Sequence, residues 1–241
     1  TFGASAYGEA RIYRFGVRVG GSVSGLEFQD LSNLDAIAIG VDVQVYGRIQ
    51  PKLRGLLEYN LGLVTYSEGS NGTLNDYQSH TVLVGVDGSF TPKVSASLKI
   101  GGTFQIVDDD GPNADDRDFS GFVASLSGSY EPFVRTTLTG SYSRSISPST
   151  SSNYLLTDDV SFSVGQVIWE DISLSATVGY SRSEVTDDDT INRLRAGASV
   201  SYQIRQWLSV VGNYSFERVN GSTSLTSYKV HTVGISLGVG L

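Results

Sequence analysis

Histidine is the first side chain to consider for acid–base chemistry, because it exchanges protons near neutral pH. The chain has two, His80 and His231, and each lies close to a polar loop of the sequence. A serine two residues further on would supply the nucleophile of a hydrolase, but Val82 and Val233 occupy those positions. No cysteine, Gly-x-Ser-x-Gly turn or phosphate-binding loop offers another enzyme. We therefore expect two polar residues without a catalytic role, and a protein that is not an enzyme.

Runs of aspartate are the second candidate, because carboxylate oxygens are the ligands that Ca²⁺ and Mg²⁺ prefer. The first run lacks the glutamate that closes a calcium loop of the EF-hand type. Solvated loops kept soluble by charge are the simpler interpretation, so we expect no resident metal and no cofactor. The residues are Asp108, Asp109, Asp110, Asp115, Asp116, Asp118, Asp187, Asp188 and Asp189.

The histidines and aspartates lie on predicted β-strands or on the loops between them. Apolar and polar residues alternate with a period of two through nearly the whole sequence, which is the pattern of β-strands. Between residues 37 and 45, the odd positions are all isoleucine or valine, and the even positions are alanine, glycine, aspartate and glutamine. The same division recurs over residues 97–106, 160–165 and 172–181. No stretch of comparable length has the 3.6-residue period of a helix. The sequence therefore predicts an all-β fold.

Short turns and longer polar loops alternate between the predicted strands. Turns are expected near residues 50–52, 91–93, 131–133, 169–171 and 205–207, and loops near residues 31–34, 67–78, 108–118, 147–157, 186–190 and 219–226. All five prolines fall in these connections, where no ladder hydrogen bond is lost. Short turns at one end and longer loops at the other are typical of an outer-membrane barrel.

These connections predict a closed, antiparallel, up-and-down transmembrane β-barrel of about 12 strands over residues 11–241. Residues 1–10 are expected to form a short periplasmic segment before the first strand. Both termini then lie on the short-turn side, which faces the periplasm in such barrels.

Low charge separates this predicted barrel from a soluble one. Only 17% of the residues are charged, whereas soluble domains average roughly 25%, and Ser, Thr and Gly fill the polar face where a water-facing sheet would carry Lys and Glu. A net charge of −8 argues against a nucleic-acid partner.

Aromatic residues fall at two levels along the predicted strands, as expected at the two membrane interfaces. The residues are Phe90, Tyr130, Phe133, Trp169 and Trp207 near the turns, and Phe104, Tyr142, Tyr180, Tyr214 and Phe216 near the loops.

Charged residues with the parity of the polar face are candidates for lining a pore. Six are basic and four are acidic, which gives a weakly positive interior that would favour small anions or acidic sugars. The alternative is a stabilising network of paired charges. The residues are Arg14, Arg18, Lys99, Arg135, Arg193, Arg195, Asp42, Glu58, Asp87 and Glu217.

Three segments, Leu138–Arg144, Thr177–Arg182 and Val211–Arg218, share a Tyr-Ser step followed by arginine. They resemble the outer-membrane proteins grouped as putative β-barrel porin 2. The segment Thr232–Leu241 is similar to the C-terminal signal strand read by the barrel-assembly machinery, although it ends in leucine instead of an aromatic residue. The resemblance implies insertion by that machinery. Members of the family include relatives associated with exopolysaccharide export, and many are longer, so a C-terminal portion of a longer protein is one interpretation beside a complete or an engineered chain.

The first functional hypothesis is a pore in the bacterial outer membrane for passive diffusion or export of small polar solutes or saccharides. The second is a structural barrel that anchors or docks a partner complex such as polysaccharide export machinery. A third is an enzyme at the membrane rim acting on lipid. The expected surroundings are the lipid bilayer and lipopolysaccharide, whose phosphates the acidic loops could bridge through divalent cations. An oligomeric interface leaves no separate signal, because lipid requires the whole outward face to be apolar.

Overall fold

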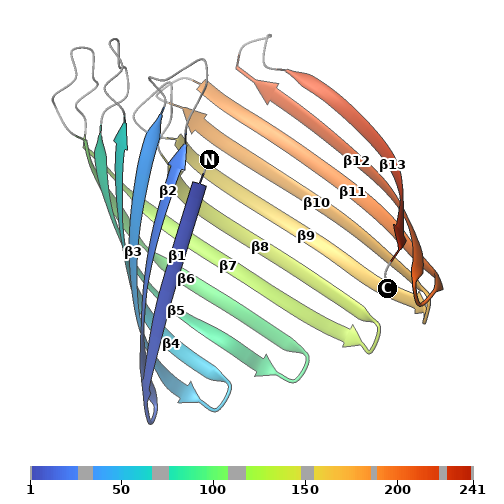
Figure 1. The fold of residues 1–241 in the computed structure, drawn as a ribbon, viewed down its shortest axis with the longest axis horizontal. Coiled ribbons are helices and arrows are strands. Elements are labelled where there is room, and N and C mark those ends of the chain that lie inside the picture. Colours follow the sequence, from blue (N-terminus) through green and yellow to red (C-terminus); the bar gives the residue numbers. More distant parts are fainter. Residues whose placement is uncertain are drawn as a thin grey trace. The chain divides into compact units, whose positions relative to one another are not determined.

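The computed structural model describes residues 2–26, 35–66, 76–107, 118–147, 155–185, 189–222 and 227–239. In these ranges the regular structure is all β-strand, as the alternation predicts (Figure 1). No helix in this part of the chain is long and apolar enough to cross a membrane. The strands are β1 (Phe2–Ile12), β2 (Phe15–Leu26), β3 (Ala36–Gln50), β4 (Leu53–Tyr66), β5 (Tyr77–Thr91), β6 (Val94–Val107), β7 (Phe119–Phe133), β8 (Thr136–Ser147), β9 (Leu155–Trp169), β10 (Ile172–Val185), β11 (Asp189–Arg205), β12 (Leu208–Gly221) and β13 (Tyr228–Val239).

The strands form one up-and-down sheet in which each strand is hydrogen-bonded to the next along the chain, from β1 to β13. The predicted count of about twelve is therefore wrong, because residues 2–12 form a strand where the sequence predicted a leading segment. The predicted closure is also wrong: over the described ranges, β1 and β13 are the two edges of the sheet and no pairing joins them.

An odd number of strands also separates the two ends of the chain. Phe2 lies at the loop end of β1, and Val239 lies at the turn end of β13, so the expectation that both termini share the short-turn side does not hold (Figure 1).

The predicted asymmetry of the connections is confirmed. At one end of the strands, six turns contain two residues each, at 13–14, 51–52, 92–93, 134–135, 170–171 and 206–207. At the other end the connections are 27–35, 67–76, 108–118, 148–154, 186–188 and 222–227. One turn lies at 134–135 instead of 131–133, so Pro132 is within β7, one residue before its end. Pro51 and Pro92 lie in turns, and Pro112 and Pro148 lie outside the described residues.

One face of the sheet is apolar and exposed along the middle of the strands. The exposed fraction is 39% for Val41 in β3, 53% for Leu57 in β4 and 56% for Val84 in β5. The opposite face carries the Ser, Thr, Gly and charged residues that alternate with them. A soluble monomer rarely exposes a contiguous apolar patch larger than a few hundred Å². The apolar face therefore requires an apolar environment.

The chain divides into two compact units. The first contains residues 1–88, 98–124 and 146–155, and the second contains residues 89–97, 125–145 and 156–241. The polar contacts among β1–β6 lie within the first unit, and those among β10–β13 lie within the second.

Gly88 in β5 occupies a backbone conformation that only glycine adopts easily, with φ at +145°. A Cβ at this position would lie 2.0 Å from the carbonyl oxygen of Lys52. We expect Gly88→Ala to lower the free energy of unfolding in detergent by about 2 kcal/mol, from strain and overpacking together. Gly212→Ala is the matched control, because nothing lies within 4 Å of its added Cβ. Urea titrations that give the two variants equal stability would contradict this prediction.

Candidate pore-lining site

Two of the predicted pore-lining residues lie in turns. Arg14 is in the β1–β2 turn, where its carbonyl oxygen accepts a hydrogen bond from the Arg48 amide at 2.8 Å. Arg135 is in the β7–β8 turn, and its carbonyl oxygen accepts one from the Val167 amide at 2.9 Å. Strand parity assigns no face to a turn residue, so the sequence argument does not apply to these two arginines.

Glu58 and Lys99 form the best-covered ion pair on the polar face. The Lys99 Nζ from β6 lies 2.7 Å from Glu58 Oε2 on β4, and the two side chains are 25% and 16% exposed. Asn60 Nδ2 and Gln44 Nε2 also donate to the Glu58 carboxylate, each at 3.1 Å. The carboxylate is therefore held by donors from three strands.

Gly85 allows Lys99 to reach Glu58 across the intervening strand β5. A Cβ on Gly85 would lie 3.1 Å from Lys99 Cγ and 2.3 Å from the Leu98 carbonyl oxygen. The absence of a side chain at this position leaves room for the lysine stem. A pair two strands apart is thus made possible by a glycine between them.

Arg54 and Asp87 form a second pair, directly across the β4–β5 ladder. Arg54 Nε donates to Asp87 Oδ1 at 3.1 Å, and Arg54 Nη2 donates to Oδ2. This two-pronged geometry is the strong form of an arginine–carboxylate contact. The guanidinium carbon also lies 5.2 Å from the centre of the Tyr46 ring.

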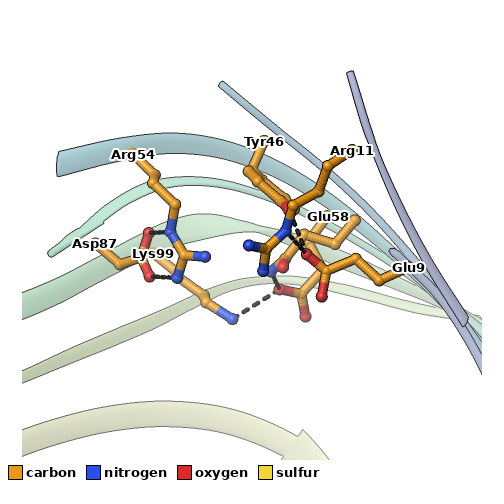
Figure 2. A network of polar contacts seen from close by, with 8 residues as sticks. Glu9, Arg11, Tyr46, Arg54, Glu58, Asp87 and Lys99 are labelled. Carbon is orange, nitrogen blue, oxygen red and sulfur yellow. Dashed lines mark hydrogen bonds and ion pairs between the residues drawn. The ribbon is translucent and has the colours of Figure 1, made fainter. Parts of the chain in front are cut away.

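Tyr46 joins this pair to residues of β1. Its hydroxyl donates to Glu9, and Arg11 Nε donates to both Glu9 Oε1 at 2.6 Å and the Tyr46 hydroxyl at 2.9 Å (Figure 2). The ring occupies the space over Gly16, where a Cβ would lie 2.3 Å from ring atoms, and Tyr46 is only 6% exposed. We call Glu9, Arg11, Tyr46, Arg54, Asp87, Gln44, Glu58, Asn60 and Lys99 the polar network.

Loss of the Tyr46 hydroxyl is expected to weaken the polar network. Tyr46→Phe removes one donor and one acceptor from a buried position, so we expect the free energy of unfolding to fall by about 1–2 kcal/mol. Tyr7→Phe is the control, because the exposed Tyr7 hydroxyl makes no hydrogen bond in the part of the chain that is described. Equal denaturation midpoints for both variants would show that the Tyr46 hydroxyl contributes nothing.

A third group lies on β11–β13. Glu217 accepts hydrogen bonds from Arg195 Nε at 3.0 Å and from the Tyr228 hydroxyl at 2.8 Å. Arg193 Nε lies 3.9 Å from the same carboxylate and has no hydrogen-bond partner among the residues that the structure describes. One carboxylate thus serves two arginines, which leaves a local excess of positive charge.

Arg18 and Asp42, the remaining predicted residues, make no ion pair with each other. The Arg18 guanidinium carbon lies 4.7 Å from the centre of the Tyr7 ring. The Asp42 carboxylate lies over Gly20, where a Cβ would be 2.2 Å from its Oδ1. Both residues lie on the polar face, and each lies against a residue of a neighbouring strand.

Neutral hydroxyl pairs cover much of the remaining polar face. The hydrogen bonds Ser141–Ser161, Ser175–Ser199, Thr81–Thr103 and Ser95–Ser129 are 2.7, 2.8, 2.8 and 2.9 Å long. Each joins two different strands of the sheet. The polar face of the described strands therefore combines hydroxyl groups with mostly paired charges.

The other chemical candidates stay apart from this face. The Tyr59 hydroxyl lies 2.7 Å from His80 Nδ1, and the Tyr214 hydroxyl lies 2.9 Å from His231 Nδ1, both on the apolar face. In the described ranges, no group of three or more His, Cys, Asp or Glu could hold a metal ion. Asp118 Oδ1 accepts a hydrogen bond from the Val107 amide at 3.3 Å. Asp108, Asp109, Asp110, Asp115, Asp116, Asp187 and Asp188, and the side chain of Asp189, lie outside the described residues.

A sheet with an uncovered apolar face and a face of hydroxyls and paired charges is typical of the wall of a membrane-spanning β-barrel. The chain belongs to the family described as putative beta-barrel porin 2, which matches residues 1–240. This confirms the resemblance seen in the sequence and supports a location in the bacterial outer membrane. Among curated proteins, none matches the chain at a significant level.

Solved structures share the fold at low identity. The ferric yersiniabactin uptake receptor FyuA from Yersinia pestis is 8% identical with a TM-score of 0.57, and the match covers 98% of this chain and 46% of the receptor chain. The FrpB iron transporter from Neisseria meningitidis is 8% identical with a TM-score of 0.59. This match covers 89% of this chain and 42% of the transporter chain. The chain thus spans less than half the length of these two barrels.

Proposed function

We propose that the chain forms the wall of an outer-membrane pore for small polar solutes or saccharides, without covalent chemistry. The observation that carries this proposal is the polar face, where hydroxyl pairs and the polar network offer hydrogen bonds with little free charge. Such a lining replaces part of a solute's hydration while it attracts ions of either sign only weakly. The family supports a pore-type barrel, and the solute class is our inference from the lining.

The proposed pore faces the periplasm with its two-residue turns and the exterior with its longer connections, as in other outer-membrane barrels. In hydrocarbon the free edges of β1 and β13 need partners, since each unpaired backbone group there costs several kcal/mol. In the pore that we propose, both edges are therefore paired.

Conductance in planar lipid bilayers tests the pore. We expect stable openings from folded protein, and swelling of protein-containing liposomes in small sugars. Folded protein that stays silent in both assays would overturn the pore and favour the alternative, a structural barrel that anchors or docks a partner complex such as polysaccharide export machinery. Release of fatty acid or sugar from outer-membrane lipid would instead indicate an enzyme at the rim.

A further inference from the structure

A group of basic and amide side chains interrupts the apolar face of β10–β13 close to the loop end. Arg182 on β10 is aligned with Asn192 on β11, which is aligned with Asn220 on β12. Arg218 on β12 is aligned with Lys229 on β13. We call Arg182, Asn192, Arg218, Asn220 and Lys229 the basic patch. All five residues belong to the second unit of the chain.

Two like charges face each other within the basic patch. Arg218 and Lys229 are direct cross-strand neighbours on one face of an antiparallel pair, a position where like charges destabilise the ladder. Over the described ranges, neither side chain has an ion pair, and Arg218 Nε donates to Asn220 Oδ1 at 3.1 Å. On the same face Arg144 of β8 is paired with Asp158 at 3.3 Å, and within the basic patch Arg182 is paired with Glu184 at 2.6 Å. Among the side chains that the structure describes, the Arg218–Lys229 pair therefore lacks the anion that the other two arginines have.

The amides of the basic patch are oriented as donors. Asn220 Oδ1 already accepts from Arg218, and Asn192 Oδ1 accepts from the Tyr180 hydroxyl at 2.7 Å. Their NH₂ groups are left to donate elsewhere. Guanidinium, ammonium and amide donors gathered on one surface form a site for an anion with several oxygens, and arginine matches phosphate geometry especially well.

The position of the patch indicates where that anion is found. On the apolar face, Val178 and Ala196 lie toward the middle of the sheet. Closer to the loop end lies a level of aromatic residues, Tyr180, Tyr214 and Phe216. The basic patch lies at this aromatic level or beyond it. A lysine or arginine on a lipid-facing strand costs about 2–4 kcal/mol at the midplane and about 0–1 kcal/mol near the interface. The basic patch is thus tolerated only at headgroup level.

We propose that the basic patch binds a phosphate group of lipopolysaccharide, with the phosphate placed between Arg218 and Lys229. The inference rests on the proposed outer-membrane orientation, in which the loop end meets the leaflet that contains lipopolysaccharide. An anion between the two cations converts their repulsion into two attractive contacts.

Binding of fluorescent lipopolysaccharide to the purified, folded chain in detergent tests this site. We expect Arg218→Gln with Lys229→Gln to weaken binding by tenfold or more. The control, Lys93→Gln with Arg135→Gln, removes the same charge at the turn end and should bind like the unmodified protein. Lipopolysaccharide without its phosphates should bind the unmodified protein as weakly as the Arg218/Lys229 variant binds the intact lipid.

Equal affinity of the two double variants would overturn the proposal. Phosphatidylglycerol vesicles or inorganic phosphate that compete as well as unlabelled lipopolysaccharide would also overturn it, since the site would then bind anions in general and not this lipid. A stability measurement guards against misfolding: without lipopolysaccharide the Arg218/Lys229 variant should be at least as stable as the unmodified protein, because a repulsion is removed. Conductance is measured separately, so a folded chain that conducts without selective lipid binding refutes this site and leaves the pore intact.

Discussion

Val178→Arg is expected to lower the free energy of unfolding in lipid bilayers by about 2–4 kcal/mol, the cost of a cation at the midplane of a lipid-facing strand. Val178 lies at the middle of β10, on the apolar face, with 46% of its surface exposed. Its neighbour across the ladder is Ala196, which offers no charge or hydrogen bond to an arginine. The new side chain would therefore have to reach the interface or draw water into the hydrocarbon.

Thr177→Arg is the matched control, one residue away on the opposite face. Thr177 is aligned with Gly197 on the polar face, where water or a polar lining can solvate the guanidinium. We expect a change below about 1 kcal/mol for this variant. Denaturant titrations of folding into lipid vesicles, followed by tryptophan fluorescence, measure both. A larger loss for Thr177→Arg than for Val178→Arg would reverse the assignment of the two faces.

The faces of the strands could be predicted because each side chain reports its own environment. In β3 every second residue from Ile37 to Val45 is β-branched and aliphatic, so one face is determined without knowledge of any neighbour. Four of the six two-residue turns could be placed for a similar local reason, since polar or proline-containing steps such as 51–52 and 92–93 separate two alternating segments. The turn at 13–14 was missed together with β1, and the turn at 134–135 was expected at 131–133.

β1 was missed because its residues give little contrast between the two faces. Gly3, Ala4, Ser5, Ala6 and Gly8 are all small, and they fit a polar face and an apolar face equally well. Its pairing with β2 continues over the full length of the strand all the same. The missing strand changed the count from odd to even, and with it the end of the sheet at which the first strand begins.

The polar network was only partly predictable, because parity gives the face of a residue but not its partners. Glu58, Asp87 and Lys99 were recognised from alternation. Arg54 and Tyr46 share that face but were missed, the first beside a turn and the second as an aromatic residue. The contact between Lys99 and Glu58 spans two strands and depends on Gly85 between them, which is a property of the folded sheet.

Opposite changes of ion selectivity are expected when the Glu58–Lys99 pair is broken from either side. Glu58→Gln leaves an uncompensated ammonium on the polar face and should shift the pore toward anions, whereas Lys99→Met leaves an uncompensated carboxylate and should shift it toward cations. One free charge changes the energy of an ion about 6 Å away by about 0.7 kcal/mol in water, roughly threefold in local concentration. Reversal potentials under a salt gradient measure this shift.

The double variant Glu58→Gln with Lys99→Met separates an electrostatic effect from a structural one. It has no free charge at this position, so its reversal potential should return to the value of the unmodified pore, although both side chains differ. Lys93→Met is a control for charge alone, because Lys93 lies in the β5–β6 turn and donates to the Pro132 carbonyl oxygen. Unchanged reversal potentials in both single variants would mean that the pair does not face the ion path, and the polar network would then serve the stability of the sheet alone. Shifts of the same sign would contradict an electrostatic effect of the pair.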